Sequence, residues 1–114
     1  MEIIVVNDAG GALEQVLAAE HSRRPITYIR HGQNLERSAA RNSGLRVARG
    51  KYIAYLDDDD RFLPNHLETL VGFLETHDYR VAYSDAWRVT QVKVGDHYEE
   101  VSRDVPYSND FNAN

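Results

Sequence analysis

Four consecutive aspartates, Asp57 to Asp60, are the side chains in this sequence best suited to chemistry. Adjacent carboxylates repel one another, so holding them on one turn costs stability unless a cation neutralises them. Oxygen ligands of this kind suit Mg²⁺ or Mn²⁺, which commonly bind one or two carboxylates together with substrate phosphates. The cluster therefore indicates a metal site at which the charge of a departing phosphate group could be stabilised. Taken alone, the four side chains fit a solvated acidic loop before a helix equally well.

Two acidic turns lie where strands are expected to end. Asp8 follows the β-branched run Ile3–Val6, and Asp57 follows the apolar run Tyr52–Leu56. Such runs are typical of strands buried on both faces of a parallel sheet, and α/β sheets bind ligands beyond the carboxyl ends of their strands. The position of the two turns therefore favours a ligand site over a solvated loop, and we expect both turns to face one crevice.

The elements that must position these side chains alternate along the first 84 residues. Apolar periodicity predicts strands at residues 3–6, 26–29, 52–56 and 79–84, and helices at residues 13–20, 38–47 and 66–75. This order defines the α/β class, a Rossmann-like fold with a mostly parallel sheet flanked by helices and right-handed crossovers.

The C-terminal part follows a different pattern. Residues 87–94 and 97–101 flank Gly95-Asp96 and predict a β-hairpin. From Ser102 onward the chain is polar, which indicates loop or disorder. We therefore expect one α/β domain over residues 1–101 and a tail over residues 102–114.

The amino-acid composition excludes several classes of function and kinds of site. The 114 residues carry 18 acidic and 13 basic side chains, a net charge of -5, and this balance argues against a dedicated nucleic-acid binder. There are no cysteines, so thiolate metal sites are excluded. The first residues have no basic segment and no cleavage-like tail, so they are not expected to be a signal peptide, and no apolar run is long enough to cross a bilayer.

Other catalytic motifs are missing or indistinct. The five histidines are scattered and show no metal-ligand spacing, and a Ser-His-Asp triad cannot be inferred because triads are recognised by geometry. Neither the phosphate-loop pattern nor the dinucleotide Gly-x-Gly-x-x-Gly pattern occurs, which makes a hydride-transfer dehydrogenase a poor match.

Several motifs in order resemble inverting glycosyltransferases of the family-2 type, which have the GT-A fold. The segments are Ala40-Arg41-Asn42-Ser43-Gly44, then residues 48–53 (Ala-Arg-Gly-Lys-Tyr-Ile), then Leu56 followed by the four aspartates. Residues 2–8 are similar to the family's second strand, and the match covers roughly the first ninety residues, whose combined order is more specific than any single motif.

The resemblance implies roles for individual residues. Asp8 would contact the base or ribose of a nucleotide-sugar donor, and the helix with Arg41 and Asn42 would lie beside the donor pocket. Asp57 and Asp59 match the two acids of the Asp-x-Asp motif. Asp59 and Asp60 would be nearest a Mn²⁺ or Mg²⁺ ion and the donor diphosphate. For Arg41, a purely structural ion pair with an aspartate is an equally good interpretation.

The resemblance also implies that the chain is part of a larger enzyme. Asn7 and Ala9 stand where the family commonly has an acid and a glycine, and the family's first strand, acceptor half and catalytic base are not matched in this chain. The parent would transfer a sugar, most often from a UDP-sugar, to a glycan or other hydroxyl acceptor with inversion, in the cytoplasm or at the inner face of the membrane, in polysaccharide biosynthesis. A partial domain exposes apolar surface, which allows a homodimer.

Two alternatives stay open from the sequence. The first is a nucleotide- and metal-binding module without catalysis, because the catalytic base is unmatched. The second is a sugar nucleotidyltransferase, which would share the sheet and an acidic metal site, although the glycine-rich basic loop that such enzymes need near their start is not visible.

Overall fold

The structure, a computed structural model, describes residues 1–21 and 23–107, with side-chain surroundings through residue 105. The described chain forms two compact units, Met1–Tyr55 and the residues from Leu56 onward. The expected boundary at residue 101 stays a prediction, and residues 108–114 of the expected tail lie outside the described residues.

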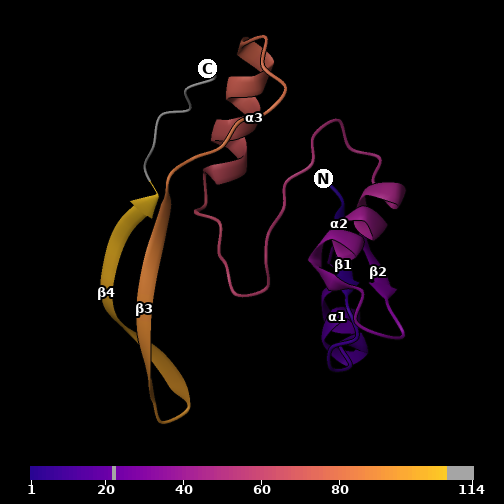
Figure 1. Cartoon of the computed structure of the whole chain (residues 1–114), viewed down its shortest axis with the longest axis vertical. Coiled ribbons are helices and arrows are strands. Elements are labelled where there is room, and N and C mark those ends of the chain that lie inside the picture. The colour runs from indigo at the N-terminus through magenta and orange to yellow at the C-terminus, as the bar shows by residue number, and fades with distance from the viewer. Residues whose placement is uncertain (22, 108–114) are drawn as a thin grey trace. The chain divides into compact units, whose positions relative to one another are not determined.

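The first unit is a parallel β-α-β arrangement followed by a second helix (Figure 1). Strand β1 (Ile3–Asn7) pairs with β2 (Ile26–Arg30) in a register that runs from Ile3 opposite Ile26 to Asn7 opposite Arg30. Helix α1 (Glu14–His21) connects the two strands. These elements confirm the predicted parallel pairing, and β1 and β2 confirm the strands predicted at residues 3–6 and 26–29.

Helix α2 (Glu36–Val47) packs against β1, whereas α1 packs against β2. The close approach of α2 is possible because Gly44 has no side chain: a Cβ there would lie 3.5 Å from Val6 Cγ2 and 3.8 Å from Ile4 Cγ2. The helix begins two residues before the predicted start, at Glu36, whose φ of 72° is in the left-handed region that favours glycine.

Two predicted strands are absent from the described structure. Residues 52–56 and 79–84 pair with no neighbouring strand, so the predictions of a third and a fourth parallel strand are wrong. A strand obtains its hydrogen bonds from a neighbour, and the parallel sheet of the described residues contains only β1 and β2. The apolar run is correspondingly exposed, with Ile53 at 46% and Leu56 at 52%.

The second unit contains helix α3 (His66–Thr76), close to its predicted position, and an antiparallel hairpin of β3 (Ala86–Val94) and β4 (His97–Tyr107). The hairpin turns at Gly95, whose φ of 61° suits the first central position of a tight hairpin turn. Arg88 and Asp104 lie opposite each other and form a two-point ion pair, with the shorter contact at 2.6 Å. The hairpin prediction is confirmed.

Strand β4 corrects the expected start of the C-terminal loop. It continues to Tyr107, so residues 102–107 are strand and not loop. Polar side chains such as Ser102 and Asp104 do not prevent pairing here, because the backbone provides the hydrogen bonds and β3 is long enough to offer partners for them.

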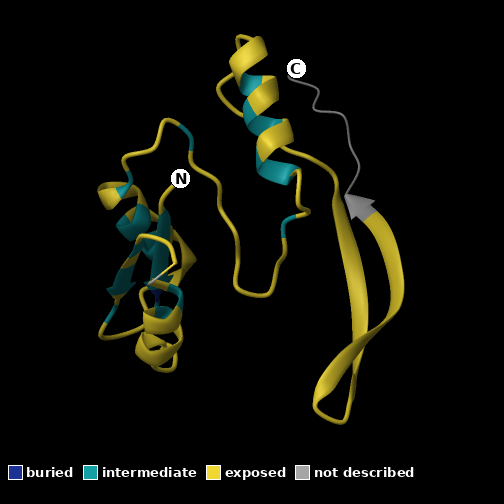
Figure 2. Cartoon of the chain, turned by 180° about the vertical axis from the view of Figure 1, so that it is seen from behind, coloured by how far each residue is buried: buried dark blue, intermediate teal, exposed yellow. Residues whose placement is uncertain are grey.

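Side chains of the described residues are mostly accessible to solvent. Intermediate burial is concentrated in β1, β2 and one side of the helices, while the hairpin is exposed over residues 86–105 (Figure 2). Among residues 1–21 and 23–105, Asn7 is the one buried residue, at 7% exposure. Within the described part of the chain, no helix has the length and apolar character needed to span a bilayer.

Candidate functional site

The loop that follows β1 is organised by Asn7. Its side-chain amide donates hydrogen bonds to the Gly11 carbonyl at 2.7 Å and to the Tyr28 hydroxyl at 3.0 Å. Its side-chain oxygen accepts the Gly10 N–H at 2.6 Å. Because this buried amide has hydrogen-bond partners for both its nitrogen and its oxygen, it fixes the path of the loop that carries the next residue, Asp8.

Asp8 lies at the carboxyl end of β1 and is held by two donors. Its Oδ1 is 2.6 Å from His31 Nδ1 and accepts the Leu35 backbone N–H at 2.9 Å. The Asp8 side chain is 19% exposed and the His31 side chain 10% exposed. His31 comes directly after β2, and its backbone N–H donates to the Asn7 backbone carbonyl at 2.9 Å. The parallel register of the two strands therefore brings Asp8 and His31 together.

The contact continues from His31 to α2. His31 Nε2 is 2.9 Å from Ser43 Oγ. A carboxylate can only accept, so Nδ1 carries the proton shared with Asp8; in the neutral ring Nε2 then accepts the Ser43 hydroxyl proton. Three side chains from the ends of β1 and β2 and from the interior of α2 therefore form one hydrogen-bonded row.

This environment favours the ionised form of Asp8. The hydrogen bond from His31, followed by the backbone N–H of Leu35, holds the pKa of the Asp8 carboxyl below its usual value. Asp8 is therefore a fixed negative charge at neutral pH, available to accept hydrogen bonds from a ligand hydroxyl.

A hollow of about 340 Å³ opens beside this row and is lined by Ala9, Arg30, His31 and Gly32. The Arg30 guanidinium at its edge also contacts Glu14 Oε1 at 3.4 Å, where both side chains are about half exposed. The hollow lies at the carboxyl ends of both parallel strands, the place where α/β sheets bind ligands.

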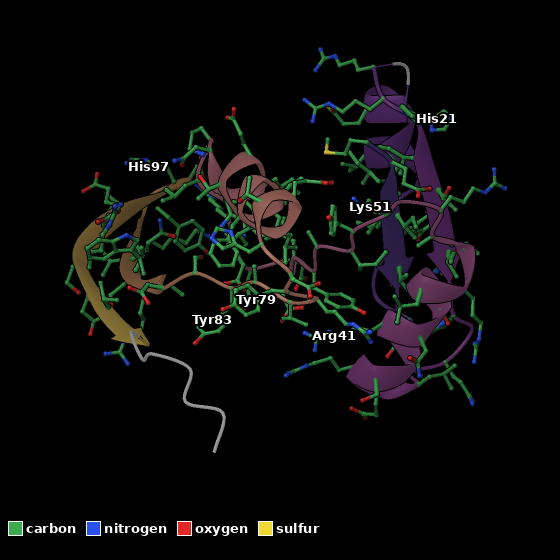
Figure 3. All side chains as sticks on the ribbon, turned by 90° about the horizontal axis from the view of Figure 1, so that it is seen from above. His21, Arg41, Lys51, Tyr79, Tyr83 and His97 are labelled. Atoms are coloured by element: carbon green, nitrogen blue, oxygen red, sulfur yellow. The ribbon has the colours of Figure 1, made fainter. Side chains whose placement is uncertain are left out.

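Arg41 and Asn42, expected beside the donor, lie on α2 in the same unit as Asp8. Figure 3 labels Arg41 on this helix. The Arg41 guanidinium carbon is 5.3 Å from the centre of the Tyr55 ring, a cation–π geometry. Both Arg41 and Asn42 are exposed, so each is accessible to a ligand.

The four aspartates lie in the second unit, on an exposed turn closed by a hydrogen bond from the Asp60 N–H to the Asp57 carbonyl at 3.1 Å. Within the described residues no three His, Asp, Glu or Cys side chains gather into a metal-binding group. The carboxylates of Asp59 and Asp60 still match the chemistry of Mg²⁺ or Mn²⁺, which bind one or two carboxylates and complete their shell with phosphates and water.

Of the expected site residues, the first unit contains Asp8, Arg41 and Asn42, and the second contains Asp57, Asp59 and Asp60. The sequence analysis missed Asn7, His31 and Ser43 as partners of the site. His31 could have been found, because a residue that directly follows the second strand must lie at the same edge as the residue that follows the first.

A parallel β-α-β unit with a fixed carboxylate at a strand end belongs to the class of α/β ligand-binding domains. Residues 1–112 match the sequence profile of the family described as "Glycosyl transferase family 2". The chain belongs to this family.

Similar proteins are themselves glycosyltransferases. The chain is 38% identical over 111 residues to the uncharacterized glycosyltransferase YwdF of Bacillus subtilis, a match that covers 96% of this chain and 40% of that protein. It is 38% identical over 88 residues to the uncharacterized glycosyltransferase YibD of Escherichia coli, covering 75% and 25% respectively. It is 36% identical over 87 residues to WcaA of Escherichia coli, named for colanic acid biosynthesis, covering 71% and 31%.

The chain thus spans 40% or less of the length of each of these relatives. No solved structure matches the chain.

Proposed function

We propose that this chain provides the donor-binding part of a glycosyltransferase with the GT-A fold, which transfers a sugar from a nucleoside diphosphate, UDP above all, to a hydroxyl acceptor. The observation that carries the proposal is the family match over residues 1–112. The fixed, ionised Asp8 at the carboxyl end of β1 supports it, because a nucleotide ribose or base offers donors to such a carboxylate.

The proposed donor contacts are the residues that the family resemblance implies. Asp8 accepts hydrogen bonds from the ribose or the base, and Arg41 and Asn42 contribute polar groups from the exposed surface of α2. Asp57 and Asp59 also contact the donor, and Asp59 with Asp60 would hold Mn²⁺ or Mg²⁺ against its phosphates. When bound there, the metal would neutralise the charge that develops on the departing diphosphate.

The reaction would be a single displacement with inversion. The acceptor hydroxyl oxygen forms a bond to the anomeric carbon while the bond from that carbon to the diphosphate oxygen breaks. The hydroxyl proton passes to a carboxylate base, an Asp or Glu, and no residue of this chain is assigned that role. The acceptor is a glycan or another hydroxyl compound, and the name of WcaA favours a role in polysaccharide biosynthesis. The parent enzyme would work in the cytoplasm or at the inner face of the membrane.

Binding without catalysis is the second candidate, and the extent of the relatives supports it. The matched region covers at most 40% of each of the three relatives, so each relative is at least about two and a half times as long as the region it shares with this chain. Family membership favours glycosyl transfer over the sugar nucleotidyltransferase alternative. A homodimer remains a prediction of the sequence analysis.

The experiment that tests the proposal is calorimetric titration of the chain with UDP, with and without Mn²⁺. We expect saturable UDP binding that strengthens when Mn²⁺ is present, and weaker binding of a nucleoside lacking the diphosphate. A chain that is folded by circular dichroism and binds no UDP in either condition contradicts the proposal.

A further inference from the structure

A row of three hydrogen-bonded side chains, Asp8, His31 and Ser43, joins three elements of the first unit. Asp8 follows β1, His31 follows β2, and Ser43 lies inside α2. The two contacts of the imidazole are 2.6 Å to Asp8 Oδ1 and 2.9 Å to Ser43 Oγ. At 10% exposure, the His31 side chain is largely shielded from solvent, so water competes little for these bonds.

The row connects Asp8 to the part of α2 that carries two of the candidate ligand-binding residues. Ser43 directly follows Asn42 on α2 and lies two residues after Arg41. The imidazole therefore bridges the carboxylate at the end of β1 and the helix turn that carries the two exposed polar residues. A ring with nitrogens on opposite sides can bridge these groups, whereas a shorter or differently branched side chain reaches one of them only.

We propose that His31 is a positioning residue for donor binding, which holds the Asp8 carboxylate in place against α2 so that it meets the nucleoside part of the donor. The inference rests on the proposed function, since it assumes that Asp8 contacts the nucleotide. His31 acts through Asp8 and needs no contact of its own with the sugar or the diphosphate.

The same three residue types form the catalytic row of serine hydrolases, and the geometry here does not favour that use. Ser43 lies in the interior of α2, where backbone N–H groups are bonded within the helix. A serine nucleophile needs free N–H donors beside it to stabilise the oxyanion. Ser43 instead anchors the imidazole to α2.

Two substitutions of His31 separate its two hydrogen bonds. In His31→Asn the side-chain amide nitrogen takes the place of Nδ1 and can still donate to Asp8. In His31→Gln the amide nitrogen takes the place of Nε2, close to Ser43 and away from Asp8. Both variants remove the ring and are otherwise matched, so a general loss of packing affects them alike.

The test is calorimetric titration of the intact chain and its variants with UDP and Mn²⁺, with circular dichroism as the control for folding. We expect His31→Gln to bind UDP about tenfold more weakly, the scale of a lost hydrogen bond to a charged group, and His31→Asn to stay within about threefold of the unmodified chain. In an Asp8→Asn background, His31→Gln should cause no further loss, because its effect passes through Asp8.

A second measurement reports on the row without a ligand. The ¹³C resonance of the Asp8 carboxyl, followed with pH, should show a higher pKa in His31→Gln than in the unmodified chain and in His31→Asn. Equal weakening of UDP binding in both His31 variants, or losses that multiply in the double variant, would overturn the inference while the proposed function stands. An unmodified chain that binds no UDP removes the proposed function, and the inference with it.

Discussion

At the scale of single residues, the turn of four aspartates concentrates negative charge on neighbouring side chains. Four carboxylates on one exposed turn repel one another, and nothing in the described structure gathers them with other acids into a closed cage. Such a turn can lose one charge without losing its fold. Individual aspartates can therefore be tested as ligands with little interference from stability.

We expect Asp59→Asn to weaken Mn²⁺-dependent UDP binding by about tenfold or more, because a carboxylate ligand is replaced by a neutral amide. The thermal midpoint should stay the same or rise slightly as repulsion falls. Asp58→Asn is the matched control, since it removes the same charge from the neighbouring residue, and it should have a clearly smaller effect. Calorimetric titration in the presence of Mn²⁺ measures both; equal losses in the two variants would mean that charge alone matters.

Asp8 makes a prediction about pH. A carboxyl whose pKa is lowered by folding stabilises the folded chain above its ordinary pKa of about 3.9, and this contribution disappears as pH falls through the lowered value. The free energy of unfolding of the unmodified chain should therefore fall more steeply with acidification than that of Asp8→Asn. The difference should develop from about pH 5 downward and continue below about pH 3.9. Urea unfolding at a series of pH values measures the difference, and parallel curves would show that Asp8 gains nothing from His31.

At the scale of elements, the entry to α2 carries a conformational cost. Glu36, the first residue of the helix, has a φ of 72°, and Ala9 in the loop after β1 has a φ of 65°. A side chain with a Cβ is strained there, typically by about 1 kcal/mol or more, whereas glycine adopts these angles readily. Both residues border the Asp8 loop, so the strain is located beside the candidate site.

Replacing Glu36 by glycine should stabilise the chain by about 0.5–1 kcal/mol, because the relief of strain outweighs the added freedom of the unfolded chain. Glu36→Ala is the control: it removes the same carboxylate but keeps the Cβ and should bring no such gain. Urea denaturation followed by circular dichroism compares the three proteins. A gain of the same size in both variants would attribute the effect to charge instead of backbone conformation.

Sequence periodicity predicted the elements whose partners lie nearby along the chain. The strands β1 and β2, the helices and the tight turn at Gly95 all follow from local patterns. The runs at residues 52–56 and 79–84 have equally good strand composition but pair with nothing among the described residues. Pairing depends on a neighbour that local composition cannot supply. The row through His31 was missed for a related reason, because its contacts join residues that are 12 and 23 positions apart. Asp8 and His31 meet through the strand register, and Ser43 reaches His31 through the packing of α2 against β1.

At the scale of the whole molecule, the family match covers far more of the chain than the parallel sheet does. The match to the family extends over residues 1–112, whereas the parallel sheet of the described residues has two strands. The assignment rests on the sequence match, which does not depend on how the two units are arranged.

We expect the chain alone to bind UDP-sugar without releasing UDP from it at a rate above that of the uncatalysed reaction. The reason is that the match covers at most 40% of the relatives, and no carboxylate of this chain is assigned the role of catalytic base. A coupled assay of UDP release, with Mn²⁺ and a mixture of hydroxyl acceptors, measures the turnover. Turnover that disappears in Asp59→Asn would place the complete reaction within these 114 residues.

The hydrogen bonds at Asp8 have a consequence for the thermodynamics of recognition. The carboxylate is already fixed by an imidazole and by a backbone amide before any ligand arrives. The rotamer entropy of this side chain is therefore lost when the polypeptide folds and not when a nucleotide docks. Association at this end of the sheet should consequently show a small entropic penalty for the protein, as expected of a preorganised receptor.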